Sequence, residues 1–567
     1  MVGVDQSRHV VSATHLTSSE HRRGVECVCA LYSDLRGASD EPSQCFILPD
    51  SSGRQVCDGC DPIWWGPVRC IHDTHSRLLY LRSDDNSTTN SNSSRRKSQH
   101  ARLPAATMPA LPTRVAIIGA GFAGLSAAAT LEKHSVDYVV YEGAGRVGGR
   151  VYSIPYEDGC LQHGAEFING ENNEIYRIAN ERNLTVEYTR DFDLFSRNVQ
   201  YGFNGQRLDK QLVKSWLDFV SDIELQFAKE AEQRSEMSVA ERFRELYEQW
   251  ITGDEKLEKD RVIFDRLARF YLTYYEIEWS SPANELALLN FADWDDGGEE
   301  KSASVTLEKK GFCDILDDIK LKVPEEKIRL NCVVKKVEYS GNGVTLTLEN
   351  GEQHHYDFVI ITCPLGFLKR NHASFFSPPL DSHKIDAIVN LGFGNMMKVF
   401  LEYSKPWWPL DVDAIAPLQS NSPLAESFPV FQPLYWNNKI LVAWVSGKGP
   451  GLISSLGDEE LVDGITQHLR EALGDQTIPR PVRIFRHSWI TDPLVGGSYS
   501  YLTPQSVKTV PDAFARMAEP ILINDRPILC FAGEHTHPTM YQTTIGAYES
   551  GEREARRVID YISLERP

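Results

Sequence analysis

The chain has 567 residues, 41% of them hydrophobic, and a formal net charge of −20 at pH 7. This length suffices for a large core and two or more domains, and no apolar run approaches the ~18 residues of a membrane span. The acidic surplus disfavours a nucleic-acid partner and attracts small cations, and ordinary solubility explains the same surplus equally well.

Residues 1–107 differ in composition from the rest of the chain. They contain 12 basic and 12 acidic residues, so residues 108–567 carry the whole net charge, and they contain six of the eleven cysteines. A Ser/Asn/Thr/Arg tract from Ser83 to His100 cannot form a core. Cys57-Asp-Gly-Cys60 has half of a zinc-site spacing without a well-spaced second pair, so we expect no metal. We predict a disordered extension, or a segment that does not belong to the working protein.

A buried strand and a glycine-rich turn open the main part of the chain. The apolar run Val115–Ile118 predicts a parallel strand, and Gly119, Gly121 and Gly124 follow it in G-x-G-x-x-G spacing. The first glycine permits a tight turn, and the second lets the backbone approach a pyrophosphate. The third lets the next helix, residues 123–131, pack closely on the strand. This pattern predicts a dinucleotide site.

A second predicted strand, Asp137–Tyr141, supports the same conclusion. It ends at Glu142, where an acid accepts hydrogen bonds from the ribose hydroxyls of a dinucleotide. All four features, the strand, the turn, the helix and the acid, predict dinucleotide binding. They do not distinguish FAD from NAD.

The elements beyond residue 150 alternate between helical and β-rich segments. Helices are predicted at Glu171–Arg182, Leu212–Glu232, Val239–Ile251 and Val262–Tyr275, with interspersed charges typical of solvated faces. Strands are predicted at Val333–Tyr339, Val344–Leu348 and Phe358–Pro364, the first two joined by a Gly341-Asn-Gly343 turn. Residues 386–490 alternate strands and helices, and the chain ends with a strand at Ile528–Glu534 and a helix at Ile545–Ile562.

This order predicts an α/β protein in which a Rossmann-like domain is interrupted by an inserted α+β substrate-binding domain. We assign residues 108–170, 305–385 and 486–567 to the first domain and residues 171–304 and 386–485 to the second. A ligand cleft is expected between them. Five cysteines of this part, which lie mostly in apolar runs, are expected to be buried thiols in a reducing compartment: Cys160, Cys313, Cys332, Cys363 and Cys530.

The run Gly145-Arg-Val-Gly-Gly-Arg-Val151 distinguishes the two cofactors. It resembles the second glycine-arginine motif of the FAD-dependent amine oxidase superfamily. The resemblance implies a glutathione-reductase-type, FAD-binding fold. It also implies that Arg146 and Arg150 neutralise the pyrophosphate while Gly149 lets the backbone pass beside the cofactor.

Four further segments extend the resemblance over residues 112 to about 563 and resemble the polyamine and spermine oxidase branch. The first, Leu161–Gly170, is similar to G-A-x-W-I-H-G. Gly164 and Ala165 match the backbone that lies by the flavin. Asn169 stands where animal polyamine oxidases have a substrate-facing histidine. An asparagine can hydrogen-bond an amine but cannot titrate near neutral pH.

The second and third segments imply the reactive centre. Asn395–Phe400 aligns with a lysine-bearing strand, so Lys398 is the implied catalytic residue, holding a water against the flavin N5 atom. In the segment from His487 onward, Trp489 is implied to pack near the isoalloxazine and Tyr499 to line the amine site. An aromatic face there offers roughly 0.5–2 kcal/mol of cation–π attraction. Ser498 replaces the cysteine that bonds FAD in monoamine oxidases, which implies non-covalent FAD.

The fourth segment is the most specific, because Phe531–His537 and Tyr541–Ala555 are similar to F-A-G-E-x-T-H and T-T-x-G-A-x-x-S-G-x-R-E-A. It implies cofactor contacts from residues that surround the flavin and the start of the last helix: Gly533, Glu534, Thr543 and Thr544. Thr543 also stands at a substrate position, where relatives acting on spermine have threonine. Two weaker assignments, which a strand valine and a solvated loop explain as well, are Val333 at the adenine end and Asp295 and Asp296 at the amine entrance.

The resemblance implies an FAD-dependent polyamine oxidase. It would oxidise a secondary amine of spermine, spermidine or an N-acetylpolyamine to an imine, which water hydrolyses to an aldehyde and an amine while oxygen becomes hydrogen peroxide. We expect a cytoplasmic monomer or weak homodimer without a nucleic-acid or membrane partner. The alternatives are a lysine-specific histone demethylase-like enzyme, an amino-acid oxidase, and a flavin-binding scaffold without turnover.

Overall fold

The computed structural model describes residues 46–49, 55–58, 114–186, 199–294 and 304–565. Two units divide the chain, Met1–Pro104 and Ala105–Pro567. In the first unit, β1 (Phe46–Pro49) pairs antiparallel with β2 (Gln55–Asp58). The prediction of a disordered or foreign N-terminal extension therefore falls mostly outside the described residues. All that follows concerns the second unit.

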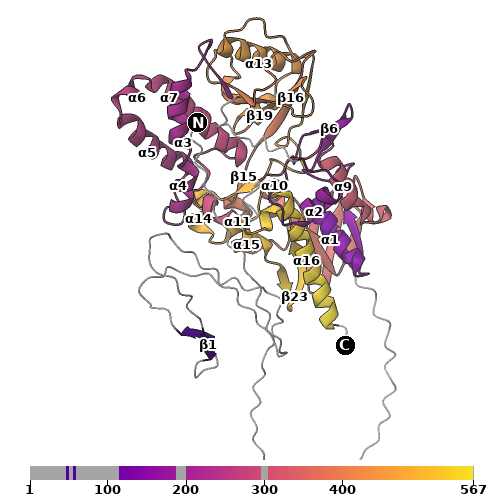
Figure 1. The fold of residues 1–567 in the computed structure, drawn as a ribbon. Helices are drawn as coiled ribbons and strands as arrows, with labels where there is room; N and C mark the ends of the chain where they lie inside the picture. Colours follow the sequence, from indigo (N-terminus) through magenta and orange to yellow (C-terminus); the bar gives the residue numbers. More distant parts are fainter. Residues whose placement is uncertain (1–45, 50–54, 59–113, 187–198, 295–303, 566–567) are drawn as a thin grey trace, which may run out of the picture. The chain divides into compact units, whose positions relative to one another are not determined.

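A six-stranded sheet contains the predicted nucleotide motif (Figure 1). Its strands in spatial order are β22 (Ile521–Ile523), β23 (Arg526–Phe531), β13 (Phe358–Ile361), β3 (Arg114–Ile118), β4 (Asp137–Tyr141) and β9 (Ile328–Arg329). All neighbours pair in parallel except β22, which is antiparallel to β23. The apolar runs predicted as buried parallel strands are confirmed, because β3 and β13 lie inside the sheet with both faces covered.

Side-chain alternation along these strands separates two cores. Val115 and Ile117 point toward α1 (Phe122–Lys133), α9 (Phe312–Leu321) and α16 (Thr544–Glu565). Ala116 and Ile118 point to the opposite face, toward a four-stranded sheet and short helices. The layers are therefore helix, parallel sheet and a second sheet with helices.

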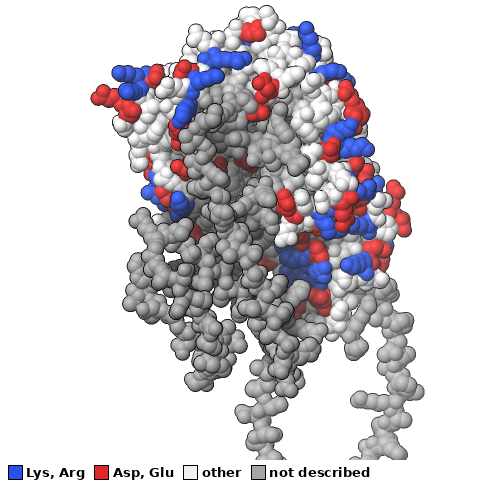
Figure 2. Space-filling model, viewed as in Figure 1, with Lys and Arg blue, Asp and Glu red and all other residues white. Residues whose placement is uncertain are grey.

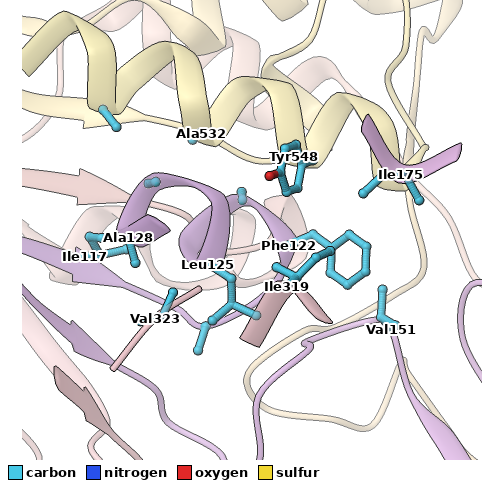
Figure 3. Packing of buried hydrophobic residues seen from close by; sticks show 14 of the residues in the cluster. Ile117, Phe122, Leu125, Ala128, Val151, Ile175, Ile319, Val323, Ala532 and Tyr548 are labelled. Atoms are coloured by element: carbon cyan, nitrogen blue, oxygen red, sulfur yellow. The ribbon is translucent and has the colours of Figure 1, made fainter. Parts of the chain in front are cut away.

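α16 lies directly against α1, although more than 400 residues separate them in the chain (Figure 3). A Cβ built on Gly551 would overlap the carbonyl oxygen of Ala123, so glycine permits this close approach. Tyr548 of α16 and Phe122 of α1 belong to the same buried cluster. The C-terminal helix is thus part of the core that supports the glycine-rich turn.

A second, seven-stranded sheet is built from later residues and one early hairpin. In spatial order it consists of β20 (Arg483–Arg486), β16 (Met397–Glu402), β19 (Ile440–Val445), β18 (Val430–Pro433), β17 (Ala414–Pro417), β7 (Val199–Phe203) and β8 (Gln206–Arg207). One face packs on α12 (Gly449–Ser454) and α13 (Asp458–Leu473). The other face, which includes Phe400 and Trp444, packs on the helical segment.

The helical segment that packs on this face contains α3 (Lys210–Val220), α4 (Ile223–Glu230), α5 (Val239–Thr252), α6 (Glu255–Lys259), α7 (Arg261–Glu278) and α8 (Asn290–Asp293). α2 (Glu174–Glu181) instead packs with α9 and α16. The prediction of one helix over Leu212–Glu232 is wrong, because the chain breaks at Ser221 and Asp222. Both residue types compete with helical hydrogen bonds through their side chains, and the Ser221 hydroxyl donates to the carbonyl oxygen of Asp218.

The remaining elements are short. The four-stranded sheet consists of β12 (Gln353–Tyr356), β11 (Gly343–Leu348), β10 (Val334–Ser340) and β14 (Phe376–Ser377), and the predicted turn joins β10 to β11. Two-stranded pairs are β5 (Ser153–Tyr156) with β6 (Gly159–Gln162), and β15 (Gly392–Phe393) with β21 (Ser500–Tyr501). The other helices are α10 (Leu365–Phe375), α11 (Ser382–Asn390), α14 (Pro504–Thr509), α15 (Ala513–Ala518), η1 (Glu325–Lys327), η2 (Ala425–Ser427) and η3 (Glu534–Thr536). Across the described ranges, none of the helices has the length and apolarity to cross a bilayer.

The expectation of five buried thiols is wrong for two of them. Cys160 in β6 and Cys313 at the start of α9 form a disulfide, 153 residues apart in the chain. The main chain brings them together, since the amide of Cys160 donates to the carbonyl oxygen of Lys309 at 2.9 Å. Cys363 and Cys530 are buried free thiols as expected, and Cys332 is a half-buried one.

Candidate active site

A cavity of about 1050 Å³ runs from the glycine-rich turn to helices α4, α7 and α8. Its wall combines residues from the six-stranded sheet, the loop after β6, strand β16 of the seven-stranded sheet, and the start of α16. The volume is at the upper end of the range for ligand pockets, so the cavity can hold a large ligand together with a second, smaller one.

The first half of the cavity is a backbone cradle. Gly119 and Gly149 line it, both with positive φ, and a Cβ on Gly119 would lie 2.5 Å from the hydroxyl oxygen of Thr362. Glu142 accepts hydrogen bonds from the amides of Ala120, at 2.6 Å, and Ala144, at 2.8 Å. Burial raises the pKa of Glu142, and these two bonds oppose the rise. Each carboxylate oxygen keeps a lone pair for a ligand hydroxyl.

A buried ion pair lies at the middle of the cavity. Arg150 Nη1 is 2.9 Å from Glu534 Oε1 and donates to the carbonyl oxygen of Ser498 at 2.6 Å. The other oxygen of Glu534 accepts from the hydroxyl of Ser500 and the amide of Gln542. Burial alone would raise the pKa of Glu534, but Arg150, His535 and the Ser500 hydroxyl hold it well below its usual range. A fixed carboxylate and a fixed guanidinium therefore face the ligand together.

Lys398 lies on β16 with only 1% of its side chain exposed. Its Nζ donates to the carbonyl oxygen of Gly164 at 2.8 Å and to Glu166 Oε2 at 2.7 Å. Burial lowers the pKa of Lys398, and Glu166 opposes that shift. The period of two along β16 places Lys398 on the same face as Phe400, which is the face toward the helical segment and the cavity.

Two polar atoms in the cavity wall are buried without a partner among the described residues: Gln542 Nε2 and Thr544 Oγ1. Gln542 has a φ of 72°, a conformation that costs a non-glycine residue on the order of 1–3 kcal/mol. Thr543 accepts from the amide of Gly546 at 2.9 Å and so caps α16. Unpaired donors beside a helix N-terminus indicate a polar or anionic ligand edge at this place.

The far half of the cavity is suited to a long cation. Glu224 on α4 and Glu278 at the end of α7 both line it, and so does the apolar side chain of Leu225, which is 59% exposed. The hydroxyl of Tyr275 donates to Glu224 at 2.9 Å. Glu224 is exposed, and desolvation by the protein around it raises the pKa of its carboxyl group. The hydroxyl of Tyr499 donates to the carbonyl oxygens of Ile277 and Glu278, which fixes its ring in the wall.

The structure gathers most of the residues that the sequence predicted. In the cavity wall are Gly119, Gly121, Glu142, Gly149, Arg150, Gly164, Ala165, Asn169, Val333, Lys398, Trp489, Tyr499, Gly533, Glu534, Thr543 and Thr544. Gly124 and Arg146 are outside it: Gly124 packs α1 on the turn, and the Arg146 guanidinium lies 4.0 Å over the ring of Tyr152. Asp295 and Asp296 lie outside the described residues.

Several polar residues of the wall were missed by the sequence analysis, among them Glu166, Glu224, Glu278 and Gln542. Glu166 stands at the unspecified position of the first motif, and Gln542 directly precedes the Thr543-Thr544 pair of the last one. Glu224 and Glu278 belong to helices whose charges indicated solvated faces. The break between α3 and α4 was the structural signal that could have separated Glu224 from those charges. Among the described residues, no group of three or more His, Cys, Asp or Glu side chains could hold a metal ion.

One buried histidine beside the site predicts acid sensitivity. His163 is 2% exposed, neither ring nitrogen has a partner among the described residues, and burial lowers its pKa to about 3. In the unfolded chain the His163 imidazole takes up a proton near pH 6.5, whereas in the folded protein it stays neutral. Its contribution to the free energy of unfolding is therefore fully present above this pH and is lost as the pH falls toward 3. We expect the Tm of His163→Leu to fall less than that of the wild type between pH 7 and pH 5 in calorimetry. His383→Leu, at an exposed histidine, is the control; parallel Tm curves for His163→Leu and the wild type would contradict the prediction.

Comparisons with known proteins agree with this arrangement. Residues 122–559 match the model of the family described as flavin containing amine oxidoreductase. The chain is 28% identical to the peroxisomal N(1)-acetyl-spermine/spermidine oxidase of Bos taurus, over 80% of this chain and 96% of that protein. It is 27% identical to the probable polyamine oxidase 5 of Arabidopsis thaliana, over 79% and 98%. It is also 27% identical to the lysine-specific histone demethylase 2 of Homo sapiens, over 78% of this chain and 53% of that protein.

Proposed function

This chain belongs to the flavin-containing amine oxidoreductase family, and from this premise we propose that it oxidises a secondary amine of a linear polyamine. Membership makes it an FAD-dependent amine oxidoreductase. The proposed products are an imine, which water hydrolyses to an aldehyde and a shorter amine, and hydrogen peroxide from oxygen.

The residues present fit FAD. Glycines at 119, 121 and 149 leave a cradle that side chains would fill, and Glu142 offers lone pairs to a ribose. The unpaired Gln542 Nε2 and Thr544 Oγ1 supply donors to a polar ring edge. When bound, FAD would accept the hydride equivalent of the amine oxidation, which carries both electrons. We propose that it binds non-covalently, since Ser498, bonded to the main chain of Met396, offers no thiol.

The observation that carries the polyamine proposal is the continuity of the cavity. One end is the dinucleotide cradle and the other bears two carboxylates, Glu224 and Glu278, with the apolar Leu225 beside them. Alternating carboxylates and apolar surface match a ligand in which ammonium groups alternate with methylene chains. On the face seen in Figure 2, acidic and basic side chains are interspersed, so we assign cation recognition to the cavity acids.

The chain's own groups then have distinct roles. Glu224 binds a distal ammonium, and the ring of Tyr499 offers a face to the amine. The reacting nitrogen must be neutral to give up a hydride from its neighbouring carbon, so the site binds it in its deprotonated form. Lys398 supplies an N–H donor at the wall beside Gly164, where it can hold a water.

Anaerobic mixing of the purified protein with amines tests this function. Spermine, spermidine, N-acetylspermine, a simple monoamine and a methylated-lysine peptide are compared by loss of flavin absorbance near ~450 nm. Rapid bleaching by one polyamine supports the proposal. Bleaching by the peptide alone would instead establish a demethylase-like activity, and a yellow protein that no amine bleaches would indicate a scaffold. Acid precipitation that releases the flavin into solution tests the non-covalent attachment.

Glu224→Gln is expected to raise the KM for the preferred polyamine roughly 5- to 30-fold, with a smaller change in kcat. The substitution keeps the hydrogen bond from Tyr275 and removes the charge that would pair with a distal ammonium. Steady-state peroxide release measures it. Glu232→Gln, at an exposed acid outside the cavity wall, is the matched control. An unchanged KM in Glu224→Gln would exclude this carboxylate from substrate binding.

A further inference from the structure

The loop after β6 supplies two partners to one lysine. The carbonyl oxygen of Gly164 and the carboxylate of Glu166, two residues later, both accept from Lys398 Nζ, at 2.8 and 2.7 Å. The side chain of Glu166 is 16% exposed and lines the cavity next to Lys398. An ammonium has three N–H donors, so these two bonds leave the third for the cavity.

The other groups around Nζ cannot replace this carboxylate. Trp444, the cross-strand neighbour of Lys398 on β19, presents its ring 5.2 Å from Nζ. His163 on the adjoining segment is neutral, since burial and the nearby Lys398 lower its pKa to about 3. Within the described residues, Glu166 is the carboxylate that lies within ion-pair distance of Nζ.

A second buried lysine of the same chain is hydrogen-bonded to two carbonyl oxygens and serves as a comparison. Lys384 is 2% exposed and donates to the carbonyl oxygens of Arg516 and Met517. Burial lowers its pKa to about 8, although Asp381 and other more distant acids oppose the shift. Lys398 is buried as deeply and has one carbonyl partner, so without Glu166 its charged form would be less stable than that of Lys384.

We propose that Glu166 is a positioning residue for amine oxidation, which keeps Lys398 as a fixed ammonium with one N–H directed to the cavity. The pair is electrically neutral, so it places a strong donor beside the reacting amine without repelling the cationic substrate. Only the kinetic consequence rests on the proposed function, because the ion pair itself is a property of the folded chain.

The kinetic test uses the Glu166→Gln holoenzyme, in which the shape and a hydrogen bond persist while the negative charge is lost. The half-reaction that Lys398→Met slows is followed by stopped flow from pH 6.5 to pH 9.5. At each pH the rate constant of the variant is divided by that of the wild type. The titration of the substrate affects both rate constants equally, so this ratio does not depend on it. We expect this ratio to fall about 10-fold or more over that range, as Lys398 loses its proton.

The matched control is Glu402→Gln. Glu402 lies on the same strand, pairs with Arg483 at 2.5 Å, and has a side chain 13% exposed, close to that of Glu166. It does not line the cavity. Its rate ratio is expected to stay constant with pH, because arginine keeps its charge throughout.

Thermal unfolding gives a readout that needs no turnover. In Glu166→Gln the lysine pKa is depressed further below its unfolded value, so the Tm deficit is largest at low pH and shrinks as pH rises. We expect a deficit of roughly 3–8 °C at pH 6.5. Adding Lys398→Met should restore part of it, since the double variant leaves neither charge unpaired.

Two outcomes would overturn the proposal. A pH-independent rate ratio in Glu166→Gln would show that the pair is merely structural, even if the Tm values are coupled. Additive Tm changes with no pH dependence would show that Glu166 does not sustain the charge. If no amine bleaches the flavin, the function fails, and the Tm cycle alone then decides whether Glu166 holds Lys398 as an ammonium.

Discussion

Lys398→Met is expected to slow amine-dependent flavin reduction, or its reoxidation, about 10²–10³-fold while FAD remains bound. Lys398 lies in the cavity wall and its Nζ donates to the carbonyl oxygen of Gly164, and methionine retains its length without a donor. The FAD contacts that we assign to the glycines, Glu142 and Glu534 are untouched. Stopped-flow measurement of both half-reactions, with the flavin content from absorbance, checks both parts of the prediction.

The control for this variant is another buried lysine. Lys384→Met removes a cation that is 2% exposed and lies outside the cavity wall, so it should lower stability without slowing either half-reaction. Wild-type rates in both half-reactions of Lys398→Met would refute the catalytic role of the lysine. A loss of FAD would instead assign Lys398 to cofactor retention.

Gly124→Ala is expected to yield a protein purified without flavin. A Cβ on Gly124 would overlap the carbonyl oxygen of Gly119, and this neighbour is backbone rather than a flexible side chain. Helix α1 must then move away from β3, which opens the cradle and costs about 1–3 kcal/mol or more of stability. The ratio of flavin to protein absorbance after purification measures the loss, and calorimetry measures the fall in Tm.

Gly451→Ala is the matched control, because its Cβ would meet no atom within 4 Å. It lies in α12, so alanine there should retain full flavin and a Tm near that of the wild type. A stoichiometric flavin content in Gly124→Ala would show that the turn tolerates movement of α1 and that Gly124 does not control cofactor binding.

The local sequence pattern predicted the elements of the fold that are determined by residues close together in the chain. The run Val115–Ile118 and the helix after it appear within one or two residues of their predicted bounds. A buried strand and a glycine-rich turn can each be recognised from a few neighbouring residues. The helix over Leu212–Glu232 failed at Ser221-Asp222, where apolar spacing alone carried no sign of the turn. The disulfide between Cys160 and Cys313 could not be predicted from the local sequence either, since 153 residues separate the partners.

The candidate site shows the same difference between features that local sequence predicts and contacts between distant segments. Lys398 was identifiable from the segment around it, and the period of two explains why it faces the cavity. Its partner Glu166 was not, because the two residues are 232 positions apart and only the fold brings them together. Glu224 had the appearance of a solvated helix charge, and its place in the cavity depends on the break before α4. Contacts between residues that are far apart in the chain could not be predicted from the sequence.

The arrangement of the six-stranded sheet also sets the order of events during synthesis. Strand β4 is finished at Tyr141, but β23 ends at Phe531 and α16 follows it. At about 5–20 residues per second, roughly 20–80 s pass between these points on the ribosome. During that interval the glycine-rich turn exists without the helix that packs on α1 or the carboxylate of Glu534. The full set of groups that we assign to the flavin is therefore present only once the last segment of the chain has been synthesised.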